Sequence, residues 1–101
     1  MGDAFCVDIQ GDSMWPTFNH GDRLTFRPHT SGEALRVGDV VVAHHPLKSD
    51  VLIVKRIARV VLDRVFLQGD HPDPLASEDS HNFGPVPSRH VVGVWVQPKV
   101  T

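Results

Sequence analysis

Apolar residues in this chain recur at every second position over short stretches, which is the period of a β-strand. Such stretches predict strands at residues 5–10, 23–27, 40–43, 51–61, 65–67 and 91–96. Turn-forming residues separate them, as in Asn19-His20-Gly21-Asp22. No helical period is sustained over about ten residues. The pattern therefore predicts an all-β protein whose twisted antiparallel sheets form a barrel-like body.

Residues 69–87 are the longest stretch without apolar periodicity. An irregular segment of this length is uncommon in a small domain unless it is functional or packs on itself. The whole chain has 101 residues, which predicts one domain over residues 1–101 with a single modest core.

Composition and charge limit the kinds of partner and the cellular location that we expect for this chain. The formal charge is −2 and no basic stripe is present, so no nucleic-acid partner is expected. The lone Cys6 excludes an intramolecular disulfide. No apolar run approaches the roughly 20 residues of a membrane span, so we expect a cytoplasmic protein without membrane contact. If an N-terminal anchor has been removed, the alternative is a membrane-associated protein.

Lys55 has an unusual position within the strand predicted at residues 51–61. Alternation places it on the same face as Val51, Ile53 and Ile57. Burial in apolar surroundings lowers the pKa of a lysine, and a neutral amine can act as a general base. The alternative is a lysine at a strand end whose amine reaches solvent.

Ser13 lies in the loop Gly11-Asp12-Ser13-Met14-Trp15-Pro16-Thr17, directly after a predicted strand. A serine hydroxyl becomes a nucleophile when a nearby base removes its proton. A rigid loop would also leave the Ser13 backbone N–H free to contribute to an oxyanion hole. Taken alone, a serine between Gly and Pro is more often an ordinary turn residue.

The sequence resembles the type I signal peptidase family of serine–lysine proteases in four segments that occur in the family's order. They are Gly11-x-Ser13-Met14-x-Pro16-Thr17, Gly38-Asp39-Val40-Val41, Val54-Lys55-Arg56-Ile57, and Gly69-Asp70 with Ser77-Glu78-Asp79-Ser80 and Phe83-Gly84-Pro85-Val86-Pro87. Together these segments cover nearly the whole chain. The fold that this resemblance implies is the signal-peptidase or LexA-like catalytic domain.

The resemblance also implies roles for single residues. Ser13 matches the nucleophile that forms the acyl-enzyme, and Lys55 matches its general base. Ser77 matches the serine that orients the lysine amine, and Asp79 matches the acid that braces this segment. Asp70 matches an acid that pairs with the arginine beside the lysine, which is Arg56 here.

The sequence departs from the family pattern at three positions. Gly11 stands where many members have a hydroxyl residue that completes the oxyanion hole, so a backbone donor replaces it or the hole is weaker. His71 stands in place of Asn, and His81 in place of an Arg. Histidine would be expected to replace that arginine as a partner of Asp79 only while protonated.

Only about a dozen residues separate Lys55 from Leu67, which leaves room for one hairpin. This short form, with Val41-Val42-Ala43-His44-His45-Pro46, is most similar to the nickel-superoxide-dismutase maturation proteases. The implied function is removal of an N-terminal propeptide from a precursor that binds as an extended peptide. The alternatives are the catalytic domain of a membrane-associated signal peptidase that cleaves exported leaders, and a non-enzymatic or self-cleaving LexA-like domain.

Met14, Trp15 and Pro16 flank Ser13 and are candidates for substrate contact, although Met14 also suits a place beneath the loop. The chain has seven histidines, but their spacing matches no metal site, so we expect them on the surface or in loops. We expect neither a metal nor a cofactor, and the sequence makes no prediction of oligomeric state.

Overall fold

The computed structural model describes residues 2–98. Its strands are β1 Phe5–Asp8, β2 Arg23–Pro28, β3 Val40–His44, β4 Leu52–Val61, β5 Arg64–Gln68, β6 Val86–Pro87 and β7 Val91–Trp95. Its helical turns are η1 Pro74–Ala76, α1 Ser80–Phe83 and η2 Ser88–His90. No helix among these residues is long and apolar enough to cross a membrane.

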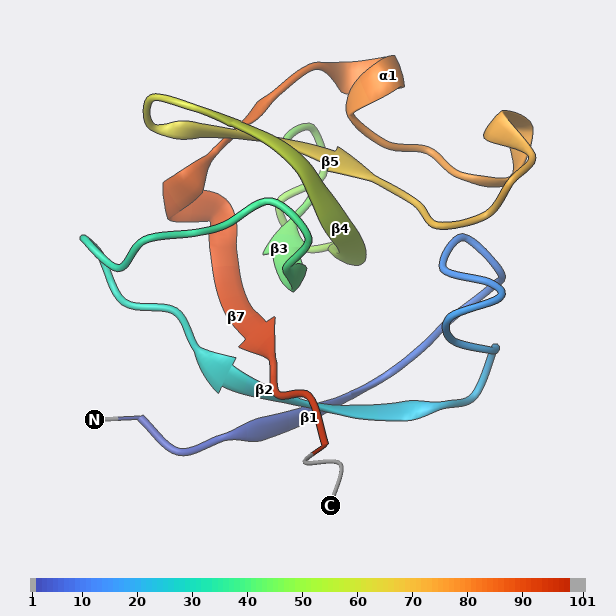
Figure 1. The fold of residues 1–101 in the computed structure, drawn as a ribbon, viewed down its shortest axis with the longest axis horizontal. Helices are drawn as coiled ribbons and strands as arrows, with labels where there is room; N and C mark the ends of the chain where they lie inside the picture. Colours follow the sequence, from blue (N-terminus) through green and yellow to red (C-terminus); the bar gives the residue numbers. More distant parts are fainter. Residues whose placement is uncertain (1, 99–101) are drawn as a thin grey trace.

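The strands of the described chain form one seven-stranded sheet in the order β1-β2-β7-β3-β4-β5-β6. Every pairing in it is antiparallel. The sheet curls, so that β1 and β2 lie opposite β4 and β5, with β7 and β3 between them (Figure 1). This confirms the predicted all-β class with a barrel-like body.

Strand β3 lies at the centre of the fold and is buried on both faces. Val41 and Ala43 belong to one core cluster, whereas Val40 and Val42 belong to the other. A strand with two buried faces has no polar alternation, which explains the continuous apolar run at residues 40–43. The curled sheet thus contains two apolar clusters, and β3 contributes side chains to both.

Strand β4 carries Lys55 opposite Val41 of β3. Ile53 and Ile57, two residues to either side, belong to or pack against the same apolar cluster as Val41. The predicted shared face is therefore confirmed for Ile53, Lys55 and Ile57, whereas Val51 precedes β4 and is 39% exposed. A register shift between Ile57 and Arg59 interrupts the alternation farther along the strand.

The segment predicted as irregular contains more local structure than expected. Asp79 caps the N-terminus of α1, and a capping box joins it to Asn82. The pattern of Asp followed three residues later by an amide is a sequence signal for a helix start, although it is weak for a helix this short. The first predicted strand is also shorter than expected, because β1 ends at Asp8.

Candidate active site

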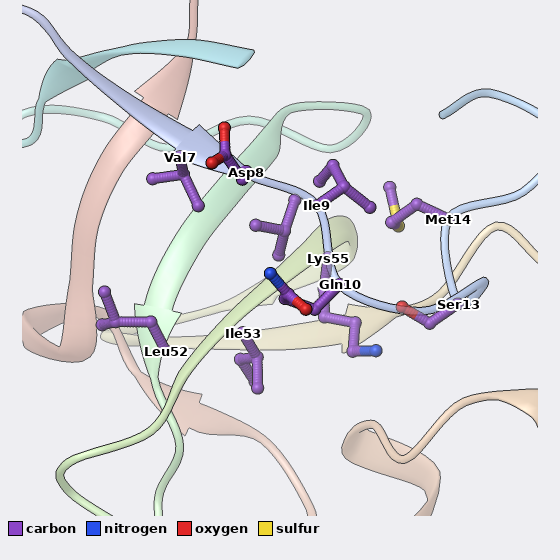
Figure 2. Close-up of a pocket in the computed structure, with 10 residues that line it drawn as sticks. Val7, Asp8, Ile9, Gln10, Ser13, Met14, Leu52, Ile53 and Lys55 are labelled. Carbon is purple, nitrogen blue, oxygen red and sulfur yellow. The ribbon is translucent and has the colours of Figure 1, made fainter. Parts of the chain in front are cut away.

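A groove of about 140 Å³ runs between the end of β1 and the beginning of β4. Apolar side chains line most of it, and Ser13 and Lys55 belong to the same lining. Figure 2 shows the Lys55 side chain extending toward the end of the groove at which Ser13 lies. The two predicted catalytic residues, 42 positions apart in the sequence, thus share one cavity.

Lys55 is 5% exposed, and its Nζ donates a hydrogen bond of 3.0 Å to the Ser77 Oγ. Burial lowers the pKa of the Lys55 amine below its ordinary value of 10.5, because the charged form loses hydration. The carboxylates of Asp79 and Glu78 oppose only part of this effect. Burial thus shifts this amine toward its neutral form, and Ser77 is its hydrogen-bond partner.

Ser13 is partly exposed in the loop after β1. Within residues 2–98, neither its hydroxyl nor its backbone N–H has a hydrogen-bond partner, and Lys55 bonds to Ser77 in place of Ser13. Catalytic hydrogen bonds are often long or unformed without substrate. An unpaired N–H beside the hydroxyl is the arrangement that an oxyanion donor requires.

The Ser13 loop is attached to the segment that follows β5. The Ser13 carbonyl accepts a hydrogen bond of 3.0 Å from the His71 N–H, and the Thr17 hydroxyl donates one of 2.6 Å to Asp70. The Trp15 ring packs on the His71 ring, with 5.5 Å between centroids. These contacts hold the Ser13 loop against a segment that is distant in the sequence.

Gly69 lies where the Ser13 loop and Ser77 meet. A Cβ at this position would lie 2.6 Å from the Ser13 carbonyl oxygen and would also collide with the Ser77 side chain. Only a residue without a side chain allows this approach. Gly69 was recognised in the sequence as part of a motif, but its steric role follows only from the fold.

Arg56, next to Lys55, forms a two-point ion pair with Asp70. Its Nε and Nη2 donate hydrogen bonds of 2.8 and 2.7 Å to the two carboxylate oxygens. Burial alone would raise the pKa of Asp70, but the hydrogen bonds from Arg56 and Thr17 outweigh it and lower the pKa. The pair joins β4 to the segment that holds the Ser13 loop.

Replacing Asp70 by asparagine is expected to lower the free energy of unfolding at pH 7 by about 1–2 kcal/mol, because Arg56 loses a charged partner in a partly buried setting. The pKa of Asp70 is lowered in the folded state, so its contribution is complete above about pH 4 and is lost as the pH falls through the folded pKa. Urea unfolding at pH 7 and at pH 3 measures this. Asp3→Asn is the control, and a difference that does not change with pH would contradict the prediction.

Asp79 is 5% exposed and lies behind Ser77. Burial would raise its pKa, but hydrogen bonds from the Gly69 N–H and from the backbone and ring of His81 outweigh this and lower the pKa. The expectation that His81 replaces arginine only while protonated needs correction. Nδ1 lies 2.8 Å from Asp79, and a neutral ring with its proton on Nδ1 also donates.

The remaining predicted site residues do not all lie in the groove. The Gly11 N–H donates to His20 Nδ1 at 2.9 Å, so this donor does not face the groove. Met14 is 1% exposed and lines the groove from the core, whereas Trp15 and Pro16 are exposed and lie outside its lining.

His45 and His29 lie in loops, as expected, but neither ring is on the surface. His45 is 4% exposed and bonded to Glu78, and the side chain of His29 is 6% exposed. Histidine is intermediate in burial preference, so sequence alone does not distinguish these two from the others. No group of three or more possible metal ligands occurs within residues 2–98.

Comparison with known proteins agrees with the resemblance in the sequence. Residues 1–82 match the family described as Peptidase S24-like. The chain is also 32% identical to mitochondrial inner membrane protease subunit 1 of Schizosaccharomyces pombe, in an alignment that covers 87% of this chain and 71% of that protein. The chain belongs to the Peptidase S24-like family.

Proposed function

We propose that this protein is a serine endopeptidase that uses Ser13 as nucleophile and Lys55 as general base. The observation that carries the proposal is the buried Lys55 amine, held by Ser77 in the same groove as the partly exposed Ser13. A lysine of lowered pKa beside a serine in a cleft is the arrangement that nucleophilic catalysis requires.

In the proposed mechanism, substrate entry brings Ser13 Oγ within hydrogen-bond reach of the neutral Lys55 amine. The hydroxyl attacks the peptide carbonyl carbon as its proton passes to Lys55. The Ser13 N–H stabilises the oxyanion. The lysine then protonates the leaving amine, the C–N bond breaks, and an ester joins the acyl group to Ser13. Water hydrolyses this ester with Lys55 again as base, which releases the acid and restores the serine.

The groove favours a substrate in extended conformation. Among residues 2–98, strand β1 is at the end of the sheet and pairs only with β2. On the other flank of the same described part, β4 pairs with β5 only from Arg56 onward, so residues 52–55 have one unpaired edge. Unpaired strand edges bind extended peptides through main-chain hydrogen bonds. A peptide that lies between them would place its backbone beside Ser13 and Lys55.

For the substrate, we propose a protein precursor from which the enzyme removes a short N-terminal propeptide in the cytoplasm. The short form of the chain and its resemblance to nickel-superoxide-dismutase maturation proteases support that precursor. The second candidate is cleavage of leader peptides at a membrane, which is favoured by the similarity to mitochondrial inner membrane protease subunit 1. Neither candidate requires a cofactor.

Incubation with purified nickel superoxide dismutase precursor is expected to remove an N-terminal segment, which intact-mass measurement detects as one defined product. Ser13→Ala should leave the precursor intact. Cleavage of an exported leader peptide in place of this precursor would support the membrane candidate. Loss of mass from the protein incubated alone would support a self-cleaving LexA-like domain. If no substrate is cleaved, the peptidase proposal is contradicted.

A further inference from the structure

Glu78 lies between two residues of the candidate site, because Ser77 bonds to Lys55 and Asp79 caps α1. Both neighbours have extended backbone conformations. Successive side chains of an extended segment point to opposite sides. Ser77 faces Lys55, and the Glu78 side chain leaves on the other side, where it meets His45.

Contacts with three other residues fix the position of His45. It directly follows β3, and its own N–H donates to the Val51 carbonyl at 2.8 Å, which closes the hairpin that leads into β4. Its ring packs on Phe83 with 5.0 Å between centroids. The Leu47 N–H donates to Nδ1 at 3.0 Å, so a neutral ring has its proton on Nε2.

The hydrogen bond from Nε2 reaches the Glu78 carboxylate at 2.7 Å. This bond lowers the pKa of Glu78, with Lys48 as a second favourable charge, so Glu78 is an acceptor in the ionised form. The β3–β4 hairpin thus contacts two successive residues of the irregular segment, once through the residue that follows β3 and once through β4. His45 bonds to Glu78 and Lys55 bonds to Ser77.

We propose that His45 is a positioning residue, whose hydrogen bond to Glu78 holds Ser77 where it orients the Lys55 amine. This inference rests on the proposed function, in which that amine is the base. His45 does not line the groove. Its loss should therefore affect the chemical step and leave substrate binding unchanged.

His45→Leu and Glu78→Ala each remove the hydrogen bond. Each is expected to lower kcat on nickel superoxide dismutase precursor by about 10–100-fold with KM unchanged, since small displacements of a catalytic group have effects of this size. His45→Gln and Glu78→Gln, which retain a donor and an acceptor respectively, should recover most of the activity. His44→Gln is the matched control, because the neighbouring His44 bonds only to the Ser49 carbonyl in the described chain.

A second readout needs no substrate. The nuclear Overhauser cross-peak between the Lys55 side chain and the Ser77 Hβ protons should weaken or disappear in His45→Leu and Glu78→Ala, and remain in the two glutamine variants. If His45→Leu does not fold, Glu78→Ala decides, because the Glu78 side chain is 58% exposed. An unchanged cross-peak in a folded variant would overturn the inference. A wild-type protein that cleaves neither this precursor nor an exported leader peptide would contradict the proposed function, and the cross-peak would still test the role of His45.

Discussion

Replacing Lys55 by alanine is expected to lower kcat/KM for peptide cleavage by about 10³–10⁴-fold while leaving the fold intact, because removal of a general base has effects of this size. The fold should tolerate the change, since burying an amine is itself unfavourable and its removal relieves that cost. Cleavage kinetics and thermal unfolding, measured on the same preparations, test both parts. Turnover near the wild-type level would contradict the role of Lys55.

Lys55→Arg distinguishes a base from a structural cation. An arginine keeps the positive charge and donor groups but stays protonated at any pH at which the protein is folded. We therefore expect it to be as inactive as the alanine variant. An arginine variant that retains activity would indicate that the site needs a charge and not a base. Arg36→Ala, at an exposed basic residue outside the groove lining, is the control and should cleave normally.

The pH dependence of cleavage has a predictable sign. The neutral amine is the active form, so kcat/KM rises as Lys55 loses its proton. Because burial lowers the pKa of Lys55, the midpoint of this rise should lie below the ordinary lysine value of 10.5. A profile that still rises with a midpoint near 10.5 would show that Lys55 is not desolvated, or is not the base.

Replacing Gly69 by alanine is expected to have the second largest effect. The new methyl group would lie 2.6 Å from the Ser13 carbonyl oxygen and would collide with Ser77. The Ser13 loop or the Ser77 segment must then move, and a shift of about 1 Å at a catalytic group can cost about 100-fold in rate. Overpacking should also lower stability by about 1–3 kcal/mol. Cleavage kinetics and urea unfolding measure the two effects.

Gly93→Ala is the matched control for this steric change. A Cβ at Gly93 in β7 would lie 2.7 Å from the Phe5 ring and 2.9 Å from the Arg27 carbonyl oxygen. Both contacts are away from the lining of the groove. We expect both glycine variants to be less stable and only Gly69→Ala to lose catalytic rate. Equal losses of activity would show that Gly69 acts through general stability alone.

Local alternation was enough to predict most of the fold and the place of Lys55. The strands have apolar residues at period two where one face is buried, or a continuous apolar run where both faces are buried. In β4 the alternation of Ile53, Lys55 and Ile57 survives because the register shift comes only after Ile57. The side of the strand on which Lys55 lies could therefore be predicted without a structure.

Contacts between distant segments could not be predicted in this way. His45 has the same sequence surroundings as the exposed His44, and only the packing of α1 and the segment before it makes one of them buried. The steric requirement at Gly69 likewise depends on two segments that meet across the sheet edge. Gly11 could be recognised as special, but its hydrogen bond to His20 depends on how the following loop returns.

The two unpaired strand edges beside the groove would determine when a substrate can be cleaved. Main-chain groups in a helix, or in the interior of a sheet, already bond to one another and are not available to these edges. The proposed enzyme would therefore act on a tail only while that tail is unstructured, with little dependence on side chains farther from the cut. A precursor whose leading segment folds onto its own body would be protected. The rate of processing would then depend on the conformational state of the substrate as much as on its sequence.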